Sequence, residues 1–534
     1  MGGFFYRNAY LLHTFAPMKA TYYILFLLLL VIGQTGCKQQ PKPIPDSRKN
    51  DYALYDSEGN LHRFSRYNNT EAIVLWVQGN GCPIVRNALT DFHAIVSEYS
   101  DQGFQFFMVN SNIQDDRDEI NAESEAFNYQ VPVLVDNAQL LADALDIQIT
   151  AEAIALHPTT REILFRGPIN NRVGYENQKE IASETYLRDA LDEIMGGKSV
   201  SRQQEVTRGC TVTRRSKIDP LTALNYTDDI APILAENCVQ CHREGGRAPW
   251  AMSDYQTITG WSGMIKEVLL SKRMPPWKAD PTIGDFQDDF SLADSNARKL
   301  IHWIDNGMAP GSGSDTLQHL SFSKKKWQRG TPDKIITLEK ETIPASKLVP
   351  YRYQTFDLAL EEDAWLKGVE IAPGNPQLVH HIVLLNRDAY KKSPITDREL
   401  RMWSDNYIAL GAGASQSTFF PDSTGVFLEK GTKLTVQLHY TPIGKEATDQ
   451  TQLGFYFHEK KPEKWFYPLA TTNVTFNIPP NSSNVKVVAR DTIKEPIHIH
   501  YVMPHMHYRG KSIKMSVIMP QGESIPLVSV PDFS

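Results

Sequence analysis

The first third of the chain alternates short apolar runs with amphipathic stretches. Residues 72–77 (AIVLWV) and 104–109 (FQFFMV) are rich in β-forming side chains, and residues 91–100 between them carry apolar side chains at helical spacing. This order predicts a strand, a helix and a second strand. Further elements are expected as strands at residues 131–135 and 162–165 and as a helix at residues 179–195. We therefore predict an α/β domain over residues 51–212.

The pattern becomes helical over residues 220–312. Apolar positions near residue 230 recur at helical spacing directly after Asp228 and Asp229, which can cap a short helix. Residues 291–306 carry a second apolar face of the same period. The pattern predicts an all-α domain.

From Lys326 onward the chain consists of short alternating runs that are broken by proline and glycine. Such a pattern is typical of an all-β sandwich. The expected strands are residues 335–338, 364–371, 378–385, 433–439 and 452–457. We predict one sandwich over residues 325–462 and a second over residues 463–534. The second has about half the length of the first, so we expect it to be incomplete.

Composition narrows the range of functions. The chain has 534 residues, of which 41% are hydrophobic and 22% charged, as in a globular protein of three or four domains. The net charge is −7 and no run of five basic residues occurs, so we expect no nucleic-acid partner.

The N-terminus predicts export from the cytoplasm. Residues 22–32 are apolar, follow Lys19, and are too few to span a bilayer, as in a signal peptide that starts at Met18. The sequence Gln34-Thr35-Gly36-Cys37 resembles a bacterial lipobox, with Gln34 where an aliphatic residue is usual. The resemblance implies a signal peptide over residues 1–37, lipidation of Cys37, a linker over residues 38–50, and a membrane-anchored lipoprotein in the periplasm or at the cell surface. The alternative is an ordinary signal peptide.

The segment WVQGNGCPIVRN resembles the thioredoxin-like redoxins, in which a cysteine lies at a strand-to-helix junction. Cys82 occupies that position, where the helix N-terminus can acidify a nucleophilic thiol. Two departures argue against turnover: Gly79 stands where a CxxC pair would need cysteine, and residues 149–151 lack the proline of the family's loop. Cys210 could pair with Cys82 in an oxidising compartment. We favour an inactive or structural module and keep thiol redox chemistry as the alternative.

Cys238, Cys241 and His242 form a CxxCH motif, which attaches haem c covalently and supplies an axial histidine. A zinc ribbon would need a second CxxC pair, and the chain has only five cysteines. This block resembles bacterial c-type cytochrome modules that contain RMPPW. The resemblance implies Met274 as the sixth iron ligand, with Met252 and Met264 as alternatives.

Eight of the fifteen histidines lie between residues 380 and 507. The segments VHHIVLL, LTVQLHYTP and PHMHYRGK resemble the copper type II, ascorbate-dependent monooxygenases, the group of peptidylglycine and dopamine β-monooxygenase. The resemblance implies one copper on His380, His381 and His439 and a second, catalytic copper on His505 and His507. Neighbouring residues of a regular strand point to opposite faces, so His380 and His381 can share one ion only if the strand is bulged. The pair at residues 498 and 500 is interpreted as structural.

The monooxygenase family completes its catalytic copper with a methionine farther downstream than this sequence extends. We therefore expect the second copper site to be incomplete, with Met503 and Met506 as the nearest substitutes. The resemblance implies hydroxylation of a C–H bond by O2, with electrons relayed by haem c from an ascorbate-like reductant or a periplasmic redox protein. The substrate, a small molecule or a peptide, stays open. The alternative is a non-catalytic electron-transfer or copper-binding lipoprotein.

Overall fold

The computed structural model describes residues 50–534, except 175–177, 216–222, 288, 323–325, 388–405, 413–415, 474, 507–508 and 534. The expected signal peptide, its lipidation site Cys37, nearly all of the linker, and His507 lie outside the described residues. Among the helices that the structure does describe, none combines the length and the apolar character needed to cross a membrane.

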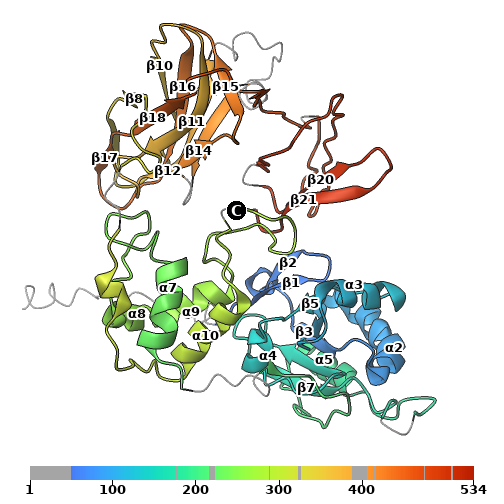
Figure 1. Cartoon of the computed structure of the whole chain (residues 1–534). Coiled ribbons are helices and arrows are strands. Elements are labelled where there is room, and N and C mark those ends of the chain that lie inside the picture. The colour runs from blue at the N-terminus through green and yellow to red at the C-terminus, as the bar shows by residue number, and fades with distance from the viewer. Residues whose placement is uncertain are drawn as a thin grey trace, which may run out of the picture. The chain divides into compact units, whose positions relative to one another are not determined.

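The α/β part, residues 51–215, is built on one seven-stranded sheet with the strand order β2-β1-β5-β4-β3-β6-β7. Strands β3, β4 and β5 are parallel, and the outer strands are antiparallel. The strands are β1 (Ala53–Asp56), β2 (Leu61–Arg63), β3 (Ile73–Gln78), β4 (Gln105–Asn110), β5 (Val133–Val135), β6 (Glu152–Leu156) and β7 (Ile163–Pro168). The helices are α2 (Pro83–Tyr99), α3 (Arg117–Ala126), α4 (Leu140–Ala144) and α5 (Tyr186–Met195). Figure 1 shows this part in blue to green.

Both faces of the central strands are buried. Val74 and Trp76 of β3 belong to one apolar core, while Ile73, Leu75 and Val77 belong to the other. A strand that is covered on both faces has no polar face, which explains why its sequence is a continuous apolar run. The predicted strand-helix-strand order is confirmed, although α2 already begins at residue 83 and α5 begins only at residue 186. Strand β6 was not predicted.

A small helical part follows. It contains a π-helix at Tyr226–Ile230, α7 (Ala231–Asn237), α8 (Tyr255–Gly260), α9 (Ser262–Leu270), α10 (Asp294–Asp305) and a short 3-10 helix at Thr316–His319. Leu234, Ile265 and Trp303 share its apolar core. The predicted cap is wrong in detail. Asn225 is the capping residue, because its side chain accepts the N–H of Asp228, which itself lies in the first turn.

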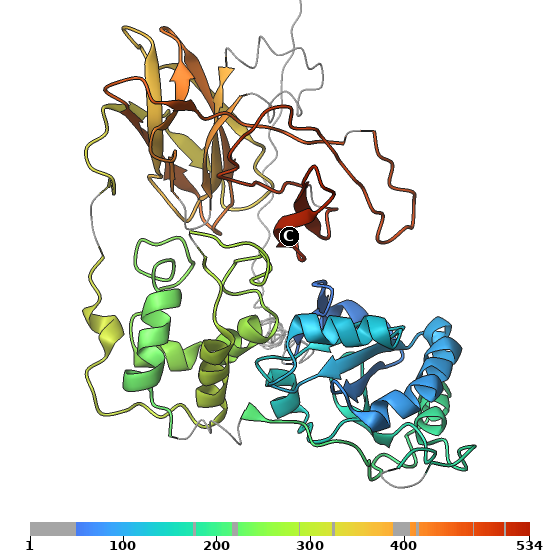
Figure 2. The ribbon, with the colours of Figure 1, turned by 45° about the vertical axis from the view of Figure 1, so that its right-hand side comes forward.

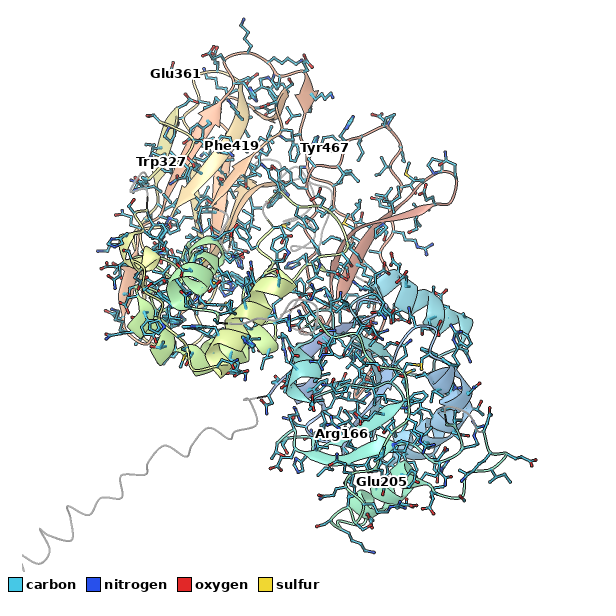
Figure 3. All side chains as sticks on the ribbon, turned by 60° about the horizontal axis from the view of Figure 1, so that its bottom comes forward. Arg166, Glu205, Trp327, Glu361, Phe419 and Tyr467 are labelled. Carbon is cyan, nitrogen blue, oxygen red and sulfur yellow. The ribbon has the colours of Figure 1, made fainter. Side chains whose placement is uncertain are left out.

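The predicted first sandwich is formed by two sheets. One has the order β10-β16-β12-β13, with β10 (Arg352–Asp357), β16 (Lys433–Tyr440), β12 (Val379–Asn386) and β13 (Tyr407–Ala412). The other has the order β19-β15-β11-β18-β8, with β19 (Lys464–Trp465), β15 (Thr424–Leu428), β11 (Ala364–Ala372), β18 (Gln452–Phe457) and β8 (Lys334–Thr337). Strand β14 (Ser417–Phe419) pairs with β11, and β9 (Glu341–Ile343) pairs with β17 (Ala447–Asp449). Figure 3 labels Trp327 and Phe419 on this part. Both sheets contribute to one apolar core.

The expected second sandwich is not formed by the residues that the structure describes. The described residues between 466 and 512 carry no helix or strand, and the only later sheet pairs β20 (Ile513–Ile518) with β21 (Ser524–Val530). Figure 2 shows these two strands at the dark red end of the chain. Large apolar side chains are exposed along the whole stretch, among them Tyr467, Leu469, Phe476, Val487, Val488, Tyr501 and Ile518. A sandwich needs two packed sheets, and one pair of strands is too little to make one, so the alternating pattern alone does not build a second sandwich in the described residues.

Candidate functional site

Cys82 lies where β3 leads into α2. It is the N-cap residue of the 17-residue helix α2, and Pro83 occupies the first helical position. The Asn80 backbone N–H donates to Asp115 Oδ2 over 3.0 Å, which fixes the short loop before the cysteine. The side chain of Cys82 is only 4% exposed. The junction predicted from the sequence is present, but its thiol is buried.

What covers Cys82 is a segment from the other end of the α/β part. Residues 207–215, which we call the strap, run past the loop at residues 148–150. The Thr150 N–H donates to the Cys210 carbonyl over 2.8 Å, and the Val212 N–H donates to the Gln148 carbonyl over 2.9 Å. A Cβ atom on Gly209 would lie 1.9 Å from the Thr150 carbonyl oxygen, so only glycine fits at this crossing.

The strap brings the two cysteines together. Cys82 Sγ and Cys210 Sγ lie 2.7 Å apart, and Thr150 Oγ1 lies 3.1 Å from Cys82 Sγ. The same hydroxyl oxygen accepts the Cys210 N–H over 2.8 Å. Cys82, Cys210 and Thr150 therefore form one compact site, and we call the two cysteines the thiol pair.

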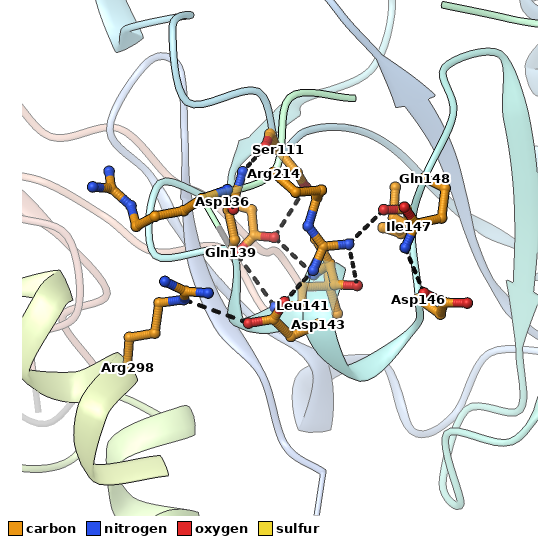
Figure 4. A network of polar contacts seen from close by, with 12 residues as sticks. Ser111, Asp136, Gln139, Leu141, Asp143, Asp146, Ile147, Gln148, Arg214 and Arg298 are labelled. Carbon is orange, nitrogen blue, oxygen red and sulfur yellow. Dashed lines mark hydrogen bonds and ion pairs between the residues drawn. The ribbon is translucent and has the colours of Figure 1, made fainter. Parts of the chain in front are cut away.

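The strap is held firmly at both ends. Upstream, its approach runs along β7, where the Glu205 N–H donates to the Arg166 carbonyl over 2.9 Å; Figure 3 labels both residues. Downstream, Thr213 N–H donates to Asn112 Oδ1 over 3.0 Å. Arg214 is buried and donates to the carbonyls of Ala142 and Ile147 and to the Asp143 carboxylate, as Figure 4 shows.

The two thiols differ in acidity. Burial alone would raise the pKa of Cys82, but hydrogen bonds from Cys210, Thr150 and the Val85 backbone outweigh it and lower the pKa below its ordinary value. Burial and the neighbouring Cys82 sulfur raise the pKa of Cys210 to about 11. Cys82 is therefore the better thiolate of the pair.

The CxxCH motif begins at the last turn of α7. The Cys241 and His242 N–H groups both donate to the Cys238 carbonyl, which closes a tight turn between the two thiols. His242 Nδ1 lies 3.2 Å from the Trp250 carbonyl oxygen, and the two rings meet edge to face at 5.0 Å. A hydrogen bond from Nδ1 to a carbonyl leaves Nε2 as the free acceptor, which is the tautomer that an iron-binding histidine needs. The chemistry of these residues thus fits covalent haem.

The three methionine candidates differ in their surroundings. Met252 is buried in the helical core, and its N–H donates to the His242 carbonyl over 2.8 Å. Met274 is 41% exposed and Met264 is 49% exposed. The favoured candidate, Met274, is thus more exposed than Met252 and slightly less exposed than Met264.

His380 and His381 lie at a bulge in β12. Val379 pairs with Tyr440 and His381 pairs with His439, so the register shifts by one residue between Val379 and His381. Val379 and Ile382 both point into the sandwich core, which places the two histidines between them on the outer face. The bulge that a shared metal site requires is therefore present.

The three imidazoles of His380, His381 and His439 form what we call the histidine cluster. One nitrogen from each lies within 4.8 Å of the other two. His439 Nδ1 is buried without a hydrogen-bond partner among the described residues. Burial and the imidazoles of His439 and His380 lower the pKa of His381 to about 4, and burial also lowers the pKa values of His380 and His439. Three neutral, converging imidazoles are a ligand set that fits copper.

The second copper set is not assembled in the described part of the chain. His505 is exposed and lies in a stretch without helix or strand, as do the alternative ligands Met503 and Met506. Its proposed partner His507 lies outside the described residues. His498 and His500 stack on each other at 6.2 Å and are exposed, in agreement with a structural interpretation.

Sequence reasoning missed Thr150 and Arg214. Residues 149–151 attracted attention only because they lack a proline, although Thr150 supplies the hydroxyl that contacts the thiol pair. Arg214 gave no signal, since one arginine among many marks nothing by itself. The glycine directly before Cys210 was the usable hint, because a glycine beside a cysteine indicates close backbone approach.

Comparisons with known proteins cover the first part of the chain. Residues 43–165 match the AhpC/TSA family. No curated protein matches this chain. Three of the similar solved structures are a hypothetical protein from Sinorhizobium meliloti 1021 (24% identity, 30% of this chain and 90% of that one, TM-score 0.28), an uncharacterized conserved protein from Geobacillus kaustophilus (23%, 31% and 89%, TM-score 0.29) and the peroxidoxin BcpB from Mycobacterium tuberculosis (13%, 27% and 90%, TM-score 0.21). The family match supports the thioredoxin-like part of the prediction, and it overlaps the predicted α/β domain over residues 51–165.

Proposed function

We propose that this chain is an extracytoplasmic redox protein that binds copper through His380, His381 and His439. The observation that carries the proposal is the bulge in β12, which turns two neighbouring histidines to the face on which His439 already lies. In a regular strand, His380 and His381 would point to opposite faces and could not bind the same ion. The bulge places both on one face.

The donor set favours copper. Imidazole suits copper and zinc, and an N-donor site generally binds Cu(II) more tightly than Zn(II). No carboxylate or thiolate belongs to the cluster of potential ligands at this site among the described residues. When bound, copper would store one electron at a time, which zinc cannot do. The chain's own contribution is to hold the three imidazoles neutral and convergent.

A covalent haem is the second proposed centre. Cys238 and Cys241 would carry it, and His242 would bind its iron through Nε2, with Met274, Met252 or Met264 opposite. The support is the Nδ1 contact of His242 with the Trp250 carbonyl, which sets the required tautomer. When bound, haem c would pass single electrons from an ascorbate-like reductant or a redox protein.

The proposed reaction is hydroxylation of a C–H bond by O2 in a copper-dependent monooxygenase, with His505 and His507 as the catalytic copper ligands. Lipidation of Cys37 would anchor the protein to a membrane. A second candidate function is electron transfer or copper binding without hydroxylation. It is favoured by the exposure of His505 and by the lack of a sheet around it in the described residues.

Copper titration of the full chain tests the proposal. We expect one tight equivalent that His439→Ala removes and that His319→Ala, an exposed histidine outside the cluster, leaves unchanged. Equal copper affinity of wild type and His439→Ala would refute the copper site. Incorporation of labelled oxygen from O2 into an added small molecule or peptide, with ascorbate present, would decide for the monooxygenase over the electron-transfer protein.

A further inference from the structure

The exposure of the two cysteines in the thiol pair is the reverse of what the position of Cys82 in a redoxin domain suggests. Cys82 stands at the junction where an attacking thiol is expected, yet it is 4% exposed. Cys210, carried by the strap, is the half-buried residue of the pair. An outside molecule therefore reaches the pair from the side of Cys210.

We propose that Cys82 and Cys210 form a disulfide that exchanges with external thiols through Cys210. Cys82 is the leaving sulfur, and the Thr150 hydroxyl donates a hydrogen bond to the Cys82 thiolate as it leaves. The sulfur atoms are 2.7 Å apart, so they can bond without a rearrangement of the strap. This site is separate from the proposed copper and haem centres, and its test does not depend on either of them.

Accessibility decides which sulfur is attacked. The strap crosses the loop at residues 148–150 so closely that Gly209 has no room for a side chain, and Arg214 secures the downstream end by three hydrogen bonds. An attacking thiolate must approach in line with the sulfur-sulfur bond. In-line attack on Cys82 would have to come from the side away from Cys210, but Cys82 is 4% exposed and belongs to the apolar core, whereas Cys210 is half-buried.

The surroundings of Cys82 suit a leaving group. Thr150 Oγ1 accepts the Cys210 N–H, so its single hydrogen is left to point toward Cys82 Sγ at 3.1 Å. The Val85 N–H in the first turn of α2 donates to the same sulfur. A thiolate that is stabilised by such donors, and that has the lower pKa of the two, departs faster.

The exchange is balanced with a dithiol as the reductant. One thiolate of the dithiol bonds to Cys210 Sγ, the Cys82–Cys210 bond breaks, and its electron pair stays on Cys82 as the thiolate. The second thiolate of the dithiol then attacks the dithiol's first sulfur, which is bonded to Cys210 in the mixed disulfide. Cys210 is released as a thiolate and takes up a proton. The external dithiol becomes a disulfide, and the reduced protein carries Cys82 as a thiolate and Cys210 as a thiol.

Trapping with a monothiol tests the direction of exchange. The full chain is oxidised with oxidised glutathione, treated briefly with 2-mercaptoethanol under native conditions, quenched in acid, alkylated and mapped by peptide mass spectrometry. We expect the mercaptoethanol adduct on Cys210 and the alkyl group on Cys82. An adduct on Cys82, or a disulfide that resists the thiol until the chain is unfolded, would overturn the proposal, as would the absence of a Cys82–Cys210 peptide after oxidation.

Thr150 supplies a second readout. Thr150→Val keeps the shape but removes the hydroxyl, and should slow native-state reduction by roughly threefold to tenfold, since a hydrogen bond to a charged group is lost from the leaving thiolate. Thr150→Ser should restore the wild-type rate. Equal rates for Thr150→Val and wild type, in proteins of equal thermal stability, would rule out the proposed role of the hydroxyl.

Discussion

The thiol pair and the histidine cluster both bring together residues that are distant in sequence, but the structural means differ. Cys82 contacts Cys210 because the strap crosses over Cys82, and the same crossing buries Cys82. The histidine cluster arises from a bulge on the outer face of a sheet, where His380 is exposed and the Tyr351 ring lies 4.8 Å from the His439 ring. The thiol pair thus depends on tertiary anchors far from the sulfur atoms. The histidine cluster depends mainly on one local irregularity.

The comparison predicts that the histidine cluster is sensitive to its own residues. His381→Ala should weaken copper binding at the tight site by at least about 100-fold, equivalent to about 2.7 kcal/mol, because one of three converging imidazoles is lost. His319→Ala, which changes an exposed histidine outside the cluster, should leave that site unchanged. Isothermal titration with both variants measures the difference. Equal losses in the two variants would mean that the three histidines are not the binding set.

The thiol pair should respond to a residue that touches neither sulfur. Arg214→Ala leaves the Ile147 carbonyl without its buried donor and removes one of the two donors to the Ala142 carbonyl, so we expect unfolding of the α/β part to become easier by about 2 kcal/mol. Alkylation of Cys82 in the reduced protein should become faster. Arg208→Ala, at an exposed position of the same strap, is the matched control and should change little. Urea unfolding and timed alkylation report the two effects, and unchanged values for Arg214→Ala would contradict the anchoring role.

A third effect, smaller per pH unit, depends on the titration of Asp136. Asp136 accepts the N–H groups of Leu141 and Ala142 at the start of α4, and the Ala142 carbonyl of the same helix accepts from Arg214. Burial raises the pKa of Asp136 to about 7 from an ordinary value of 3.8. Between these values the folded chain binds the proton that the unfolded chain has released. Asp136 should therefore make the α/β part more stable as the pH falls from 7 toward 4, by at most about 1.4 kcal/mol per pH unit.

Urea unfolding at several pH values, followed in wild type and Asp136→Asn, measures this contribution. The asparagine cannot titrate, so its stability should vary less over the same range. Parallel curves for the two proteins would show that Asp136 is ionised in the folded state at all of these pH values.

The sequence carried enough information for the elements whose pattern has one physical cause. Residues 73–78 are apolar without interruption because both faces of β3 are covered, and that alone identified a central strand. The bulge in β12 was expected because two neighbouring histidines can bind the same metal ion only if the strand is bulged. In both cases the local sequence states the geometric requirement.

Other features depend on contacts that no local pattern encodes. Thr150 becomes important only because Gly209 and Cys210 pass beside it, and that approach is fixed by Arg214 and Asn112. In the stretch after residue 465, by contrast, a local pattern was present but predicted the wrong structure. Its alternating apolar residues suggested a sandwich, but the described residues form only the two-stranded β20–β21 sheet, and most of the large apolar side chains before it are exposed.

The strap also bears on how the redoxin part can be isolated as a fragment. The family match ends at residue 165, before the end of β7, while α5, Cys210 and Arg214 all lie beyond it. A fragment cut at that boundary would uncover Cys82 and expose its thiol as an ordinary reactive nucleophile. Chemical behaviour measured on such a fragment would belong to a different molecule, so the natural unit for expression and assay extends through residue 215.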